Sequence, residues 1–152
     1  MSPLSAFRRR IPAPDGMSWP HVVIIGGGEL NTSDDDKSAV QERVEADLGW
    51  VLDLATEHGI PVLGLCYGLG IVTQHFGGLV DKTFGEPPGA VEVTLTDDGA
   101  ADPLFAGIPP SFLAFVSHKE ACREMPEGAV LLAGGQACPV QAYRVGGNVW
   151  VT

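Results

Sequence analysis

Two short apolar runs, each followed at once by a tight turn, constrain the fold of this chain more than any other feature. The first is VVII (residues 22–25), which precedes three glycines, and the second is IPVLGL (residues 60–65), which precedes Cys66. Runs of this length, rich in branched side chains and bounded by turns, indicate buried strands. The segment between them, residues 34–58, has apolar side chains at helical spacing: Val40, Val44, Leu48, Val51, Leu52 and Ala55.

The helix between these strands has recognisable ends. Ser33 or Asp34 is a suitable N-cap, and Gly59 suits the C-terminal stop. A second helix is expected over residues 67–75, directly after the second strand. The order strand, helix, strand, helix predicts an α/β fold with a parallel sheet and a right-handed crossover.

The two ends of the chain differ in sequence pattern from this strand–helix–strand–helix unit. Residues 1–20 hold four prolines and no periodic pattern, so we expect a disordered leader there and one domain over residues 21–152. After residue 79 the sequence changes to shorter strand-like runs separated by turn residues, namely AVEVTLT, FLAFV, AVLLAG, CPVQAYRV and NVWVT.

Charge and cysteine content exclude several classes of function. The chain has 9 basic and 19 acidic residues, a net charge of −10, which disfavours nucleic acid and anionic membranes as partners. Its apolar runs are strand-sized and no secretory signal is present, so we expect a cytoplasmic protein. The three cysteines (Cys66, Cys122 and Cys138) lack paired metal-type spacing, and no cofactor fingerprint is present. We therefore expect neither a metal site nor a cofactor.

Cys66 lies where the second strand ends and the second helix begins, which is where parallel α/β sheets bind ligands. A nucleophile at such a sharp turn needs small neighbours, and Gly64 and Gly68 flank it. The helix dipole favours the thiolate, and the N–H of Tyr67 is available to a developing oxyanion. The glycine turn after the first strand offers a second donor, for which we choose Gly28. We interpret Cys66 as a candidate nucleophile, the alternative being a small buried cysteine.

Four segments, in this order, resemble the class I (triad-type) glutamine amidotransferases, in particular the stand-alone, GMP-synthase-like members. They are VVIIGGG, PVLGLCYGLGIVTQHFGG, FVSHKE and CPVQAYRVGGNVWVT, within residues 21–152. The resemblance implies a flavodoxin-like three-layer sandwich with a mostly parallel sheet. It also implies that L-glutamine is hydrolysed to glutamate and ammonia through a γ-glutamyl thioester, and that an ammonia-accepting synthetase is a partner.

The resemblance also implies roles for individual residues. Cys66 would be the nucleophile, and Gly28 and Tyr67 would form the oxyanion hole. The residues that would line the glutamine pocket are Ser117, His118 and Lys119. Because the corresponding loop of the family contacts substrate, we do not assign His118 as the catalytic base.

The sequence departs from the family pattern in places that bear on activity. Glu29 stands where the family commonly has a proline, and Gly70 where it often has a substrate-holding glutamine. The family strand matching NVWVT continues into a segment of the form QFHPE, which supplies the histidine base and its orienting acid, whereas this sequence stops at Thr152. The family also has a βαβ-type unit ahead of VVIIGGG. We therefore expect a domain incomplete at both ends, with little glutaminase activity alone.

Three other interpretations remain open. A non-catalytic scaffold or regulatory subunit would keep the fold without the triad, which agrees with these departures. A γ-glutamyl peptidase would use the same triad on a peptide substrate. Another cysteine hydrolase, such as a dienelactone-hydrolase-like enzyme, would need its acid and histidine on a different strand order, and the SHKE and CPVQAYRV segments weigh against it.

Overall fold

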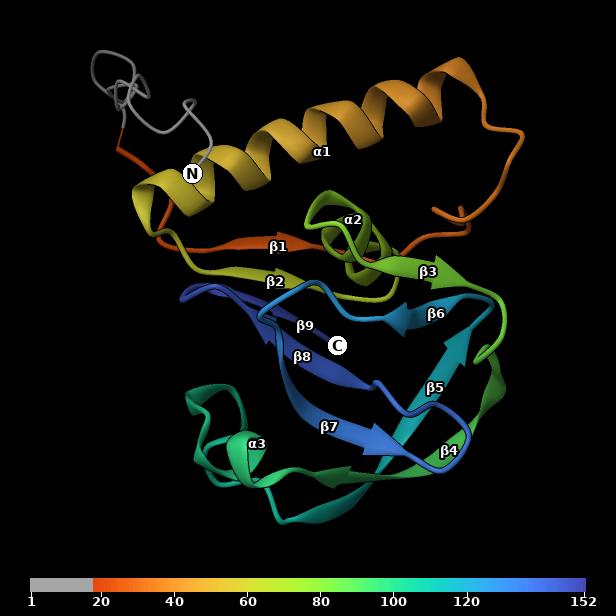
Figure 1. Cartoon of the computed structure of the whole chain (residues 1–152), viewed down its shortest axis with the longest axis vertical. Coiled ribbons are helices and arrows are strands. Elements are labelled where there is room, and N and C mark those ends of the chain that lie inside the picture. The colour runs from red at the N-terminus through yellow and green to blue at the C-terminus, as the bar shows by residue number, and fades with distance from the viewer. Residues whose placement is uncertain (1–17) are drawn as a thin grey trace.

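The computed structural model describes residues 18–152, which form nine strands, three α-helices and one 3₁₀ helix, η2 (Figure 1). The strands are β1 Val23–Ile25, β2 Val62–Gly64, β3 Leu79–Asp81, β4 Glu86–Leu95, β5 Ser111–His118, β6 Ala121–Glu124, β7 Val130–Gly135, β8 Ala142–Val145 and β9 Val149–Val151. The helices are α1 Ala39–His58, α2 Tyr67–His75, α3 Asp97–Ala101 and η2 Pro103–Phe105.

Seven of these strands form one sheet, in the order β1-β2-β9-β8-β7-β4-β5, and β3 pairs with β6 in a separate ribbon. Strands β1, β2 and β9 are parallel, and α1 makes the predicted crossover from β1 to β2. The remaining pairs of the large sheet are antiparallel. The predicted α/β fold is confirmed, but the parallel arrangement is confined to three strands and the sheet as a whole is mixed.

Helix α1 confirms the helical spacing but not the predicted first residue. The helix begins after Ser38, whose hydroxyl accepts a hydrogen bond from a first-turn amide at 3.2 Å, and it ends at Gly59 with φ of 66°. The choice of Ser33 or Asp34 as N-cap was wrong because both belong to the preceding loop. The backbone N–H of Ser33 donates to the Glu120 carboxylate at 2.8 Å, a contact 87 residues distant in the sequence.

The alternation of side chains along β9 shows how the layers are arranged. Val149 and Val151 are buried in a core that includes residues of α1 and α2. Trp150 points to the opposite face, where it packs against the core of β4, β7 and β8. Figure 1 shows α1 and α2 together over β1 and β2, with α3 beside β7. The carboxyl ends of β1, β2 and β9 therefore share one edge of the sheet, next to the start of α2.

The predicted leader, residues 1–20, falls outside the described residues except for its last three. Of these, Trp19 stacks on the ring of His58, with 4.3 Å between ring centroids, and packs against the first core. No helix within residues 18–152 has both the length and the apolar character needed to cross a membrane.

Asp102, at the N-terminus of η2, joins this helix to β8 and β9. Its buried carboxylate accepts hydrogen bonds from Arg144 and Trp150, both at 2.9 Å, and from the backbone of Leu104 at 3.0 Å. Burial alone would raise the pKa of Asp102, but these hydrogen bonds outweigh it and hold the pKa below the ordinary value of 3.8. The resulting stabilisation is present above the unfolded-state pKa and is lost as pH falls through the lower folded-state pKa.

We expect Asp102→Asn to lower the free energy of unfolding at pH 7 by about 1–3 kcal/mol, because the charge-assisted bond to Arg144 is lost. In denaturant titrations, the difference in free energy of unfolding between variant and parent should become smaller as pH falls below 3.8. The exposed Asp36→Asn is the matched control, with an expected change within about 0.5 kcal/mol. A difference in free energy of unfolding that stays constant across this pH range would contradict the stabilising role of the ionised Asp102.

Candidate active site

Cys66 occupies a strained turn between β2 and α2. Its φ of 54° and ψ of −105° make it the one non-glycine residue with positive φ among residues 18–152. Such a conformation costs energy and is found preferentially at functional sites. The Cys66 N–H donates to the carbonyl of Thr152 at 3.1 Å, so the ends of β2 and β9 hold the turn. The side chain itself is exposed.

The glycines flanking Cys66 allow α2 to lie directly against the sheet. A Cβ on Gly64 would lie 2.7 Å from the carbonyl oxygen of Gly68, and a Cβ on Gly68 would overlap the carbonyl oxygen of Ile25 in β1. Both contacts involve backbone atoms, which cannot rotate away. A side chain at either position would therefore force the start of α2, next to Cys66, away from the strands.

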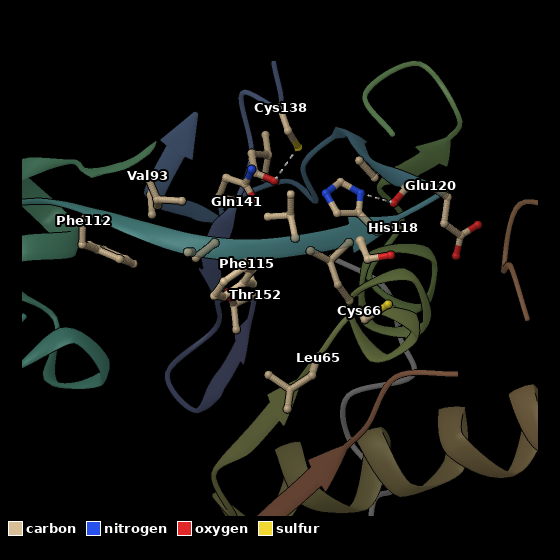
Figure 2. A pocket seen from close by; sticks show the side chains of 18 of the residues that line it. Leu65, Cys66, Val93, Phe112, Phe115, His118, Glu120, Cys138, Gln141 and Thr152 are labelled. Carbon is tan, nitrogen blue, oxygen red and sulfur yellow. Dashed lines mark hydrogen bonds between the residues drawn. The ribbon is translucent and has the colours of Figure 1, made fainter. Parts of the chain in front are cut away.

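An open cavity of about 870 Å³ lies in front of Cys66. It is lined by all six residues predicted to have a catalytic, oxyanion-binding or substrate-binding role: Gly28, Cys66, Tyr67, Ser117, His118 and Lys119. Segments separated by about 90 positions thus meet at one opening. A smaller cavity of about 320 Å³ shares Cys66 and His118 with it and extends along apolar side chains of β4 and β5, including Phe112 (Figure 2).

The two predicted oxyanion donors, Gly28 and Tyr67, line this opening, and their backbone N–H groups are unused. Neither the amide of Tyr67 nor that of Gly28 donates a hydrogen bond to another residue in the range 18–152. The glycine in contact with the Cys66 side chain is Gly27, since a Cβ there would lie 3.1 Å from the Cys66 Cβ and 3.5 Å from its sulfur. The glycine turn after β1 therefore lies directly against the Cys66 side chain.

His118 lies in both cavities, but its ring is held by other groups. Nδ1 is 2.9 Å from the carbonyl oxygen of Glu120, and Nε2 is 2.9 Å from the Glu86 carboxylate. No other histidine of the sequence lines either cavity: His58 stacks on Trp19 and His75 lies 3.3 Å from Asp53. Among the described residues, therefore, no histidine is hydrogen-bonded to the sulfur of Cys66.

Residues 12–145 match the family model described as "Glutamine amidotransferase class-I", which is most of the chain. The chain belongs to the class I glutamine amidotransferases. The predicted resemblance is thereby confirmed at the level of the family.

The chain aligns with individual relatives over different shares of their length. The chain is 31% identical over 125 residues to the glutamine-hydrolyzing GMP synthase of Thermosipho africanus, covering 82% of this chain and 21% of that protein. It is 29% identical over 123 residues to a protein of Thermococcus kodakarensis that is named as one subunit of a glutamine-hydrolyzing GMP synthase, covering 81% and 57%. The chain thus spans about a fifth of the first relative and just over half of the second.

A solved structure supports the fold. The glutamine amidotransferase of Thermotoga maritima superposes with a TM-score of 0.73 at 19% sequence identity, over 86% of this chain and 54% of that one. At this identity the likeness concerns the fold alone, and it confirms the flavodoxin-like α/β class.

The space around Gly70, a departure from the amidotransferase pattern, is occupied by side chains of other segments. A Cβ at this position would overlap the Thr32 hydroxyl and lie 2.9 Å from the Glu120 carboxylate. Glu120 accepts hydrogen bonds from the backbone and hydroxyl of Thr32 at 2.8 and 2.9 Å, and from the Ser33 backbone. This carboxylate fills the space beside α2, so a glutamine at residue 70 could not enter the cavity without displacing it. The other departure, Glu29, lines the cavity mouth.

Several residues of the site were not identified from the sequence. Glu45 of α1 is one of them, and it accepts a hydrogen bond from the Tyr67 hydroxyl at 2.9 Å. Burial, and secondly this carboxylate, raise the pKa of Tyr67. Glu86 and Cys138 lie beside His118, and the Glu120 carboxylate anchors the loop after β1. Each of these contacts joins distant segments, and no local motif signals them.

The other two cysteines are buried. Cys122 and Cys138 have 0% and 1% of their surface exposed, and burial raises the pKa of each thiol to about 11. Cys66 is therefore the accessible thiol of the chain.

Proposed function

We propose that Cys66 is the nucleophile of a glutamine-hydrolysing site. The observation that carries the proposal is a strained, exposed cysteine that faces an open cavity together with two unused backbone donors. Its sulfur would attack the side-chain amide carbon of L-glutamine, forming a C–S bond and an oxyanion. The amides of Tyr67 and Gly28 would hold that oxyanion. Cleavage of the C–N bond would release ammonia once the leaving nitrogen gains a proton, and water would then cleave the γ-glutamyl thioester to glutamate.

The end of β5 and the residue after it supply the groups that would hold the amino-acid end of the substrate. Lys119 is exposed at the cavity wall and makes no ion pair with another described residue, so its ammonium group is available for the α-carboxylate of glutamine. Ser117 offers a hydroxyl on the same wall. His118, held at both ring nitrogens, would contribute to the shape of the pocket.

We propose further that the ammonia is passed to a synthetase. The relatives named GMP synthase support this step, since one is about five times longer than the matching region and another is named as one subunit of such an enzyme. The acceptor site would then lie on other parts of such a protein or on a partner chain.

A second candidate function, a scaffold without catalysis, is favoured by one observation. Within residues 18–152 no histidine is hydrogen-bonded to Cys66, the contact through which a histidine would activate the thiol and protonate ammonia. The two candidates differ in whether the cavity binds glutamine.

Labelling with a chloroketone analogue of L-glutamine, in which the chloroketone replaces the side-chain amide, distinguishes the candidates. We expect one label on Cys66, suppressed by L-glutamine and absent from Cys66→Ser. Cys122 and Cys138 should react at least about 100-fold more slowly, because thiols with raised pKa and no exposure hold little thiolate.

The site of labelling is read by peptide mass spectrometry. Labelling of Cys66 that L-glutamine does not suppress would contradict the glutamine site and favour the scaffold. Suppression by a γ-glutamyl dipeptide but not by L-glutamine would identify a γ-glutamyl peptidase instead.

A further inference from the structure

Three donor side chains that the proposed reaction does not use converge at the inner wall of the site. Glu86 begins β4, His118 ends β5, and Cys138 lies in the turn between β7 and β8. Their ligand atoms, a carboxylate oxygen, an imidazole nitrogen and the thiol sulfur, all lie within 4.8 Å of one another. Glu86 and His118 are paired across the β4–β5 ladder, which fixes their relative position. In the view of Figure 2, His118 lies between Cys138 and Cys66.

The hydrogen bonds of His118 determine which of its nitrogens can bind a cation. The Glu120 carbonyl oxygen can only accept a hydrogen bond, so Nδ1, 2.9 Å away, must carry the proton. In the neutral ring, Nε2 then presents its lone pair to the Glu86 oxygen at 2.9 Å. Two acceptors at this distance require a proton or another cation between them. Fixing Nδ1 on a carbonyl, with Nε2 directed at the ion, is also the arrangement that orients metal-binding histidines.

Among residues 18–152, no lysine or arginine lies against the Glu86 carboxylate to supply the positive charge. The Glu86 side chain is only 4% exposed, and within residues 18–152 its sole ionic partner is His118. Among the same residues, the one further hydrogen-bond donor to this carboxylate is the neutral amide of Gln141, at 2.6 Å from the oxygen that faces His118. The buried Cys138 thiol is the third potential metal ligand, and the group of three contains no lysine or arginine.

We propose that Glu86, His118 and Cys138 form a Zn²⁺ site. One sulfur, one nitrogen and one oxygen donor form a set suited to Zn²⁺, whereas Mg²⁺ and Ca²⁺ require oxygen donors. Bonds of about 2.0–2.3 Å place tetrahedral ligand atoms roughly 3.3–3.7 Å apart, so shifts of about 1 Å bring the three donors into position. Cys138 would lose its proton to solvent as the S–Zn bond forms. The adjoining cavity of about 320 Å³ leaves room for water as the fourth ligand.

Such an ion would connect β4, β5 and the β7–β8 turn at the wall that also carries the substrate-facing loop. It would fix the orientation of His118 independently of whether glutamine binds. The site therefore does not depend on the proposed reaction, and its test needs no turnover.

Titration of the full chain with Co²⁺, followed by displacement with Zn²⁺, tests the site. We expect one equivalent of Co²⁺ to produce a thiolate charge-transfer band in the near ultraviolet and visible bands typical of tetrahedral coordination, all abolished by Zn²⁺. Cys138→Ser should remove the charge-transfer band. Calorimetry should show Zn²⁺ affinity reduced at least about tenfold in Cys138→Ser, Glu86→Gln and His118→Asn. Cys66→Ser, which alters the neighbouring thiol, should retain both band and affinity.

Circular dichroism of each variant shows whether a loss of metal binding comes from a loss of fold. The Co²⁺ absorption spectrum of the unaltered chain tests the site without any substitution. Absence of the charge-transfer band from the unaltered chain would overturn the proposal. A band that persists in Cys138→Ser but disappears in Cys66→Ser would also overturn it, because the metal would then be bound by the nucleophile.

Discussion

Hydrolysis of L-glutamine by the 152-residue chain is expected to be several orders of magnitude slower than the roughly 1–10³ s⁻¹ typical of enzymes. This expectation rests on the four histidines: both ring nitrogens of His118 are engaged, and the other three line neither cavity. A thiol lacking a positioned histidine loses both its activation and the acid that protonates ammonia. Ammonia release is measured for the parent chain and for Cys66→Ser, and the difference between the two rates is the part that depends on Cys66.

Imidazole in solution provides the positive control for this prediction. Because the cavity in front of Cys66 is open, a diffusible base can reach the sulfur, and the rate should rise with imidazole concentration. The rise should vanish in Cys66→Ser. Turnover at usual enzymatic rates without imidazole, and lost on substitution of Cys66, would show that one of the described groups already acts as the base.

The features of this molecule that could be predicted from its sequence are those specified by neighbouring residues. Helical spacing and the glycine stop located α1, and the apolar runs located β1 and β2. Gly64, Cys66 and Gly68 specify the turn because its geometry depends on residues within one turn of helix. The gathering of Ser117, His118 and Lys119 near Cys66 came from the family resemblance, and the structure places all four at one cavity.

The features that could not be predicted depend on contacts between distant segments. The N-cap of α1 was misplaced because Ser33 is held by Glu120, which no local pattern reveals. The same carboxylate, together with the Thr32 side chain, occupies the space that a side chain at Gly70 would need. The sequence alone shows only that the family's glutamine is missing at this position. The Glu86, His118 and Cys138 cluster has no metal-type spacing, since its donors come from two strands and a turn. Sheet register, not sequence proximity, brings them together.

Substitution of Gly68 by alanine is expected to destabilise the chain by at least about 4 kcal/mol, a loss that leaves little or no folded protein in a domain of ordinary stability. The added Cβ would overlap the Ile25 carbonyl oxygen and lie 3.0 Å from its carbonyl carbon, both in the backbone of β1. Relief requires α2 to move away from β1 and β2, which separates a helix buried along most of its length from the core. Urea or thermal unfolding followed by circular dichroism measures the loss.

Gly147→Ala is the matched control, because no heavy atom lies within 4 Å of its added Cβ and its φ is not positive. The control should unfold within about 0.5 kcal/mol of the parent chain. If Gly68→Ala instead folds with near-parent stability, α2 can sit farther from the sheet than the structure shows. Cys66 would then not be held in its strained turn by close packing, and the proposal that this turn presents the nucleophile would lose its structural basis. The stability of this variant therefore tests the active-site geometry as well as the fold.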